Sequence, residues 1–313
     1  GVVADIADRV VVMQYGQVVE TGTVNKVLNE PEHPYTKALI ASVPSLMPRA
    51  PRPRSEQIVL SADKIQKTFG GGKSFFGLGK PNRFVHAVKD VTLDLRSGET
   101  LGVVGESGSG KSTLARCIIR LLDSDSGNIL LDDVDIRALN RAEMRPLRTK
   151  IQMVFQDPFA SLNPRIKVGQ IISQGPIIQG ESRQTAEARA RELLEIVGLD
   201  ERAFNRYPHE FSGGQRQRIG IARALALDPE ILVADEPVSA LDVSIQAQIL
   251  ELLDEIRENM NLSMLFITHD LRVAAQVCDR LAVMRYGEIV ETGATSEIFK
   301  NPQHSYTPVS YTH

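Results

Sequence analysis

The sequence predicts an α/β domain built around a mostly parallel sheet, and three observations support this prediction. Short apolar runs typical of buried strands occur in LGVVG, EILVAD and SMLFITHD. Longer segments with helical periodicity, EARARELLEIVGL and SIQAQILELLDEIREN, alternate with these runs. The first apolar run leads through a glycine-rich turn into a helix that begins near Lys111. Strands and helices that alternate in this way favour a sheet of parallel strands covered by helices.

The composition indicates a globular chain with no strong electrostatic preference. Of the 313 residues, 42% are hydrophobic, which is enough for a substantial core. A net charge of -3 and a pI near 6.1 give no global attraction to nucleic acid or anionic lipid, although local basic patches remain possible. Cys117 and Cys278 lack the paired spacing of a zinc or iron–sulfur site, so we expect two buried thiols in a reducing compartment. No apolar run approaches the length of a membrane span.

The chain contains a repeat whose period is a whole domain. Residues 1–36 and 272–307 align at one constant offset, so that DRVVVMQYGQVVETG matches DRLAVMRYGEIVETG. Asp8 matches Asp279, and Tyr15 matches Tyr286. Because a solenoid unit would be much shorter, we expect a fragment of a tandem protein, in which residues 1–44 are the C-terminal tail of a truncated first copy.

The segments on either side of residue 57 differ in character. VPSLMPRAPRPRSEQ carries four prolines and three arginines, and such a composition favours extended, solvated backbone. We therefore interpret residues 45–56 as a linker and residues 57–313 as a complete second domain with its own tail. IVLSADKIQKTF and FVHAVKDVTLDLRSG are predicted as strands, and the glycines of GGGKSFFGLGKPNR suit a flexible loop between them.

GESGSGKST predicts a phosphate-binding loop, because it fills the pattern G-x-x-x-x-G-K-[ST] between a predicted strand and a predicted helix. Glycines let such a loop curl so that backbone N–H groups point at phosphate oxygens, and the helix N-terminus adds partial positive charge. Lys111 is expected to reach the β- and γ-phosphates, and Ser112 to place its hydroxyl on Mg²⁺. The predicted loop comprises Gly105, Glu106, Ser107, Gly108, Ser109, Gly110, Lys111, Ser112 and Thr113.

Two further stretches add chemistry to this loop. ILVADE is an apolar strand that ends in Asp235 and Glu236, where one carboxylate can hold the Mg²⁺ shell and the other can orient a water molecule. FSGGQRQR lies between the two motifs and is a short Ser-Gly-Gly turn that opens a basic helix.

In this order the motifs resemble those of the ATP-binding cassette (ABC) ATPases. FSGGQ resembles the signature motif of that family, with Ser212, Gly213, Gly214 and Gln215 at its centre. Gln156 in VFQDP resembles the Q-loop, Asp242 ends a D-loop-like SALD, and His269 in FITHD resembles the switch histidine. The resemblance covers about residues 57–293 as one nearly complete cassette. It implies a P-loop NTPase (RecA-like) core, an antiparallel β subdomain and a helical subdomain that carries the signature motif.

The resemblance also implies ATP and Mg²⁺ as cofactors and a head-to-tail pair of cassettes, in which each signature motif covers the ATP of the other. Gln156 would ligate Mg²⁺ together with Ser112 and Asp235, Glu236 would be the general base, and His269 would contact the γ-phosphate. An aromatic ring is expected to stack on adenine. Phe69 in KTFG fits this role best, and Phe84 is the alternative.

A narrower resemblance links FQDPFASLNPR and PEHPYT to the oligopeptide and dipeptide branch of bacterial importers, which includes nickel and glutathione systems. It implies an ATPase that energises import of peptides or related solutes, peripheral to the cytoplasmic face of the bacterial inner membrane. The implied partners are transmembrane permease subunits, a second nucleotide-binding cassette that is fused or homodimeric, and indirectly a periplasmic solute-binding protein. No nucleic acid is expected.

Some details of this branch are absent or altered. Neither tail has a cysteine cluster, so we predict no iron–sulfur centre, and the residues after Thr307 depart from the first copy. The alternative function is a soluble cassette ATPase of DNA repair or translation. Against it, no long coiled coil or zinc-binding cysteine pair lies between Lys111 and Ser212, and the linker is short and proline-rich. The sequence does not identify the transported solute.

Overall fold

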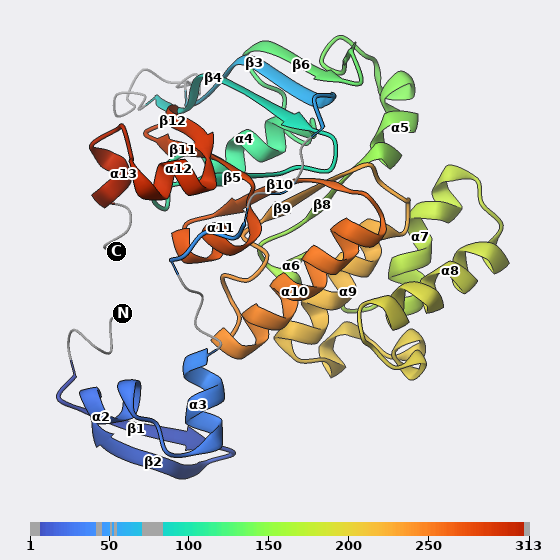
Figure 1. The fold of residues 1–313 in the computed structure, drawn as a ribbon. Coiled ribbons are helices and arrows are strands. Elements are labelled where there is room, and N and C mark those ends of the chain that lie inside the picture. Colours follow the sequence, from blue (N-terminus) through green and yellow to red (C-terminus); the bar gives the residue numbers. More distant parts are fainter. Residues whose placement is uncertain (1–6, 42–45, 51, 53–54, 71–83, 310–313) are drawn as a thin grey trace, which may run out of the picture.

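A computed structural model describes residues 7–41, 46–50, 52, 55–70 and 84–309 (Figure 1). Its central sheet has six strands in the order β12-β11-β5-β10-β9-β8. All neighbours are parallel except β12, which runs antiparallel to β11. The predicted, mostly parallel sheet is therefore confirmed. The strands are β5 (Thr100–Val104), β8 (Ile151–Val154), β9 (Ile231–Asp235), β10 (Ser263–Thr268), β11 (Arg280–Arg285) and β12 (Glu288–Ala294).

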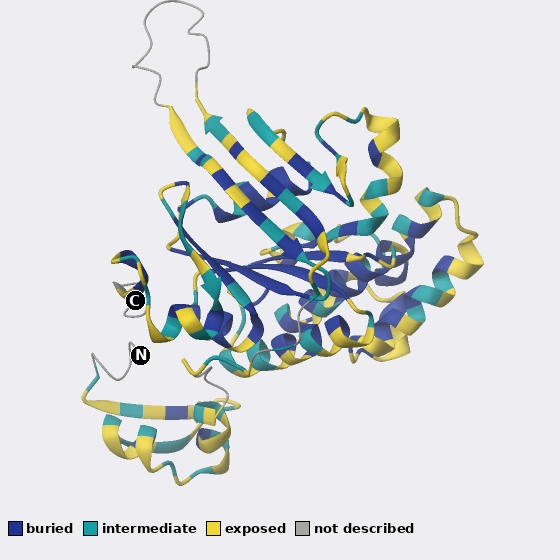
Figure 2. Cartoon of the chain, turned by 45° about the horizontal axis from the view of Figure 1, so that its top comes forward, coloured by how far each residue is buried: buried dark blue, intermediate teal, exposed yellow. Residues whose placement is uncertain are grey.

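Both faces of the central sheet are buried along β5, β9 and β10. On β10, Met264 and Phe266 belong to the apolar cluster on the side of the large helices, whereas Leu265 and Ile267 belong to the cluster on the other side. Because successive side chains of a strand point to opposite faces, a continuous run of apolar residues packs into the apolar clusters on both sides of the sheet. Figure 2 shows these strands as a continuous buried layer inside the domain.

A second, antiparallel sheet covers one side of the domain, and its strand order is β4-β3-β6-β7. The long pair β3 and β4 confirms the two strands expected on either side of the glycine-rich loop, and residues 71–83 of that loop lie outside the described part. Helix α4 (Lys111–Ile118) shares one apolar cluster with this sheet through Leu114 and Ile118. The strands are β3 (Ile58–Phe69), β4 (Val85–Arg96), β6 (Ser126–Leu131) and β7 (Val134–Asp135).

Helix α5 packs on the side of the antiparallel sheet through Met144, whereas the other helices cover the opposite face and α6 to α9 build the predicted helical subdomain. The two segments with helical periodicity in the sequence, EARARELLEIVGL and SIQAQILELLDEIREN, lie in helices α8 and α10. None of the described helices combines the length and the hydrophobicity that a membrane span needs. The helices are α5 (Arg141–Lys150), α6 (Pro158–Ser161), α7 (Val168–Gln179), α8 (Arg183–Ile196), α9 (Gly213–Leu225), α10 (Val243–Asn259) and α11 (Leu271–Val277), with 3-10 turns at Glu201–Asn205 and Pro208–Glu210.

The sequence repeat is also a structural repeat. Both hairpins turn at a tyrosine in the left-handed region, Tyr15 with φ of 50° and Tyr286 with φ of 48°. Both also shift register at the same place, one residue before the matched methionine. The first copy consists of β1 (Arg9–Gln14), β2 (Gln17–Thr23), α2 (Val24–Asn29) and α3 (Pro34–Ala41), and β11 and β12 of the second copy are followed by α12 (Thr295–Lys300) and α13 (Tyr306–Val309).

The two copies differ in what covers them. Strands β1 and β2 form a separate two-stranded sheet, whereas β11 pairs with β5 in the central sheet. Met13 is consequently 55% exposed, although its counterpart Met284 is fully buried. The figures show the first copy as a small unit apart from the central sheet (Figure 1).

Two arginines of the linker are held against the domain. The Arg49 guanidinium contacts the Asp254 carboxylate, and Arg52 bridges Asp254 and Asp279 with distances of 2.8 Å to each. Asp279 also accepts a hydrogen bond from the backbone N–H of Thr100, the first residue of β5. The composition predicted solvated backbone for this segment and gave no sign of these side-chain contacts, for which Asp254 on α10 and the buried Asp279 supply the carboxylates.

We expect Arg52→Ala to lower the free energy of unfolding by about 2 kcal/mol, because Asp279, whose side chain is only 4% exposed, loses its guanidinium partner. Urea unfolding at neutral pH measures this change. The control is Arg202→Ala, whose side chain is 93% exposed and which should leave stability nearly unchanged. Equal losses in the two variants would contradict the importance of the linker contacts.

The same contacts predict a pH dependence. Burial raises the pKa of Asp254, but the hydrogen bonds from Arg49 and Arg52 outweigh burial, and the net pKa is lowered. A carboxyl with a lowered pKa in the folded state adds stability above its unfolded pKa, and this stability is lost as the pH falls through the folded value. The stability difference between the parent and Arg52→Ala should therefore shrink in acid.

Candidate nucleotide site

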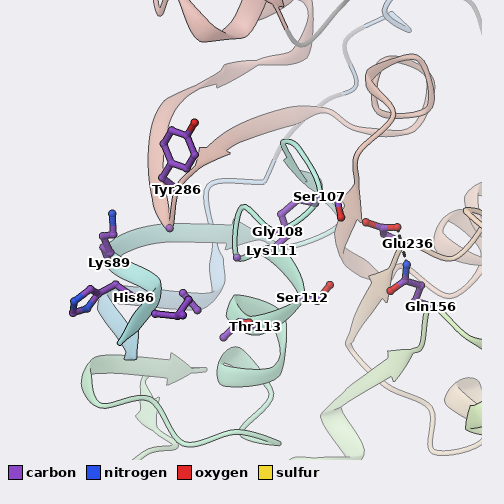
Figure 3. A pocket seen from close by; sticks show the side chains of 14 residues that line it. His86, Lys89, Ser107, Gly108, Lys111, Ser112, Thr113, Gln156, Glu236 and Tyr286 are labelled. Carbon is purple, nitrogen blue, oxygen red and sulfur yellow. Dashed lines mark hydrogen bonds between the residues drawn. The ribbon is translucent and has the colours of Figure 1, made fainter. Parts of the chain in front are cut away.

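A cavity of about 520 Å³ opens beside the N-terminus of α4, where the predicted phosphate loop leaves β5. Figure 3 shows Gln156 and Glu236 at one end of this cavity and His86, Lys89 and Tyr286 at the other, with the loop between them. The structure thus brings together residues from sequence-distant elements. The loop residues that line the cavity are Ser107, Gly108, Gly110, Lys111, Ser112 and Thr113.

Close packing explains two glycines of the loop. A Cβ atom on Gly105 would lie 2.1 Å from the Met284 carbonyl oxygen, and one on Gly110 would lie 2.0 Å from that of Ala87. Both glycines also have positive φ, 151° and 109°, which side chains disfavour. Strands β11 and β4 therefore press directly on the loop backbone, and only glycine fits at these two places.

Lys111 is the first residue of α4 and is almost fully buried. Its ammonium nitrogen Nζ donates hydrogen bonds to the carbonyl oxygens of Gly105 (2.7 Å) and Glu106 (2.8 Å). Burial lowers the pKa of Lys111, whereas the nearby carboxylates of Glu236 and Asp235 raise it. The amino group thus lies inside the curl of the loop, where the terminal phosphates of a nucleotide are expected.

Ser112 and Asp235 form the second contact of the site. The Ser112 hydroxyl donates to Oδ1 of Asp235 at 2.8 Å, at the end of β9. The other carboxylate oxygen, Oδ2, is buried and has no hydrogen-bond partner among the described residues, and burial raises the pKa of this group. An orphaned carboxylate oxygen beside a hydroxyl suits a hard cation that prefers oxygen ligands, so these residues fit Mg²⁺. Elsewhere among the described residues no cluster of three His, Cys, Asp or Glu side chains could hold a metal.

Glu236 is held by two motif residues that lie far apart in the sequence. Its Oε2 atom accepts from the Gln156 amide at 3.0 Å and contacts Nδ1 of His269 at 3.1 Å. The hydrogen bond with His269 lowers the pKa of Glu236 and raises that of His269. The backbone of Glu236 has φ of 45°, and its N–H donates to the carbonyl oxygen of Ile267 on β10. The backbone at Glu236 is strained, and its anchored carboxylate stays ionised at neutral pH, so it is able to accept a proton.

The signature motif does not line this cavity in the described chain. Ser212 caps α9, where its hydroxyl accepts from the Gln215 N–H and its own N–H donates to the Gln215 side chain. A Cβ atom on Gly214 would lie 2.5 Å from Ile245 of α10, so the motif packs closely there. Gly213 starts α9, and Asp242 precedes α10 with its side chain exposed.

The sequence did not predict the residues that line the end of the cavity away from Gln156 and Glu236. His86, Lys89 and Tyr286 line it, whereas neither Phe69 nor Phe84 is among its described lining residues. Both phenylalanines are exposed, and the stacking of either on adenine stays a prediction. The repeated Tyr-Gly turn was the available signal for Tyr286, because Gly287 donates its N–H to the Ser109 carbonyl and so brings the turn to the loop.

Comparisons with known proteins agree with this geometry. The pattern of the family described as ABC transporter matches residues 88–239. A second pattern, described as oligopeptide/dipeptide transporter, C-terminal region, matches residues 19–77, which include part of the first copy and the linker.

Individual proteins are similar over most of the chain. The glutathione import ATP-binding proteins GsiA of Salmonella paratyphi A and of Escherichia coli K12 are each 46% identical over 98% of this chain and 53% of their own length. The chain therefore spans about half the length of the curated relatives it matches. Among solved structures, the dimeric, post-hydrolysis ATP-binding cassette MJ0796 bound to ADP and Pi is 31% identical, with a TM-score of 0.66 over 75% of this chain and 98% of that one.

Proposed function

The chain belongs to the ABC transporter family of ATPases, and on this premise we propose that it binds and hydrolyses ATP to energise the import of peptides or related solutes such as glutathione. The observation that carries the proposal is the convergence of Lys111, Ser112, Gln156 and Glu236 on one cavity. The names of the relatives support the solute class. None of the relatives described above favours the DNA repair or translation alternative.

In the proposed mechanism, each residue has a role that follows from its place in the site. The loop N–H groups and Lys111 bind the phosphates, and the ionised Glu236 accepts a proton from the attacking water. Gln156 and His269 hold the Glu236 carboxylate in a fixed direction. Ser112, Asp235 and Gln156 would hold Mg²⁺, which supplies charge stabilisation to the phosphate oxygens when bound.

We further propose that a second cassette completes the site. Ser212 to Gln215 lie outside the cavity of their own domain, as expected if they cover the nucleotide of an opposed cassette. The proposed partners also include transmembrane permease subunits and, indirectly, a periplasmic solute-binding protein. In this proposal residues 1–44 are a cassette tail, residues 45–56 a linker and residues 57–313 a cassette, peripheral to the cytoplasmic face of the bacterial membrane.

Uptake in the host cell tests the proposed function. Deletion of the gene should abolish uptake of labelled glutathione or of labelled short peptides, and restoring the full-length parent protein should recover it. The same full-length protein with Glu236→Gln should not restore uptake, because transport requires hydrolysis. Unchanged uptake of all these solutes in the deletion strain would refute the import function.

A further inference from the structure

The C-terminal tail reaches the phosphate loop through one tyrosine. Tyr306, the first residue of α13, is only 4% exposed. Its hydroxyl oxygen accepts a hydrogen bond from the backbone N–H of Glu106 at 3.2 Å. A residue far from every motif of the site therefore contacts the second residue of the loop.

A set of hydrogen bonds fixes the tail that carries this tyrosine. Glu291 on β12 accepts from the backbone N–H groups of Gln303 at 2.8 Å and His304 at 3.2 Å. The Nδ1 atom of His304 in turn accepts from the Tyr306 N–H at 3.1 Å. The Thr307 hydroxyl also donates to Glu291. These contacts hold the start of α13 against β12, so the ring of Tyr306 has a defined direction.

A cation strengthens the connection between the tail and the cavity. The Arg285 guanidinium lies 4.6 Å from the ring centre of Tyr306 and 4.9 Å from that of Tyr286, which lines the cavity. Such cation–π contacts are worth most when the cation is partly desolvated. The first copy has Gln14 at the position of Arg285, so its hairpin lacks this cation although it keeps both tyrosines, Tyr15 and Tyr35.

The peptide groups of Glu106 are held from two directions. Tyr306 accepts from its N–H, and Lys111 donates to its carbonyl oxygen at 2.8 Å. If Lys111 turns toward bound phosphates, as the proposed function requires, its hydrogen bond to the Glu106 carbonyl oxygen is lost. The hydrogen bond from the Glu106 N–H to Tyr306 does not depend on Lys111 and continues to hold the loop.

We propose that Tyr306 is a positioning residue for nucleotide binding, which keeps the phosphate loop in its binding shape through the hydrogen bond to Glu106. This inference rests on the proposed function, because it concerns the affinity of the same site for ATP. A loop that is already ordered binds its ligand without losing further conformational freedom, so removal of this support should lower affinity.

Tyr306→Phe tests the inference, because it removes the accepting oxygen and keeps the ring on Arg285. We expect the Kd for MgATP and for MgADP, measured by calorimetry, to rise about tenfold, since a backbone N–H of the loop loses its partner. The KM for ATP should rise similarly, whereas kcat should stay within about twofold, because saturating nucleotide restores the shape of the loop.

The chain contains a matched control for this experiment. Tyr35 occupies the same position in the first copy, and its N–H donates to Nδ1 of His33 at 3.1 Å, as that of Tyr306 does to His304. Tyr35→Phe should leave nucleotide affinity unchanged. Arg285→Gln, which copies Gln14, should raise the Kd in the same direction by loosening the ring of Tyr306.

Three results would count against these ideas in different ways. A parent protein that binds no MgATP would refute the proposed function itself. A parent protein that binds MgATP, together with a Tyr306→Phe variant of unchanged Kd and KM, would refute only the positioning role. A fall in kcat or in nucleotide-free melting temperature without a change in Kd would assign Tyr306 a merely structural role, and this would also overturn the inference.

Discussion

The Glu236→Gln variant is expected to bind MgATP like the parent while its rate of hydrolysis falls by about 10² to 10⁴, the usual contribution of a positioned general base. The amide keeps the shape of the side chain but cannot accept a proton from water. The lowered pKa of Glu236, caused first by the hydrogen bond with His269, means that the parent carboxylate is ionised at neutral pH. Release of inorganic phosphate at saturating MgATP measures the effect.

The control for this experiment is Glu258→Gln, which makes the same chemical change at an exposed side chain at the end of α10. It should hydrolyse ATP at the parental rate.

Because Glu236→Gln does not consume ATP, paired cassettes should accumulate in it as the protein concentration rises, and light scattering can detect them. Parental hydrolysis by Glu236→Gln would remove Glu236 from its assigned role.

Lys111→Ala should abolish the stabilisation of the protein by MgATP. At a ligand concentration about a hundredfold above Kd, binding adds roughly 2.7 kcal/mol to the free energy of unfolding of the parent. The variant lacks the amino group that lies inside the loop, so it should gain almost none of this stability. Thermal melts with and without MgATP measure the gain.

Each variant in this series is compared with its own nucleotide-free melt, because Lys111 also holds the carbonyl oxygens of Gly105 and Glu106. Lys26→Ala is the control, since Lys26 pairs with Glu32 at the surface of the first copy. It should keep the full response to MgATP. A Lys111→Ala protein that is stabilised as strongly as the parent would place the terminal phosphates elsewhere.

The sequence predicted the parts of the site that depend on local chain geometry. Residues from Gly105 to Thr113 lie in one strand, loop and helix, so their spacing alone defines the loop. The pairing of Ser112 with Asp235 was also predictable, because both residues were assigned to one ion, Asp235 ends one predicted strand and Ser112 follows the loop after another. The roles of Gln156 and Glu236 came only from the family resemblance, and the hydrogen bond between their side chains was not predicted.

The remaining contacts depend on the order of strands, which no local pattern specifies. The turn at Tyr286 and Gly287 reaches the phosphate loop because β11 lies next to β5. The Tyr-Gly turn by itself is equally compatible with solvent, as Tyr15 demonstrates with 97% exposure. The contacts of the linker are also not predictable from its local sequence. Its composition favours solvation, yet Arg52 finds Asp279, a partner more than two hundred residues away in the chain.

The order of strands also governs when the site can form during synthesis. Strand β5, which carries the phosphate loop, lies between β10 and β11, and these begin only at Ser263 and Arg280. A ribosome therefore completes the loop and most of the helical subdomain long before either neighbour of β5 exists. Pairings between strands so distant in the chain form slowly, and unpaired apolar strands promote aggregation in the interval. Translation that stops before Ser263 would leave β5 without both of its neighbours, so a nascent chain must extend through β10 and β11 before it can hold a nucleotide.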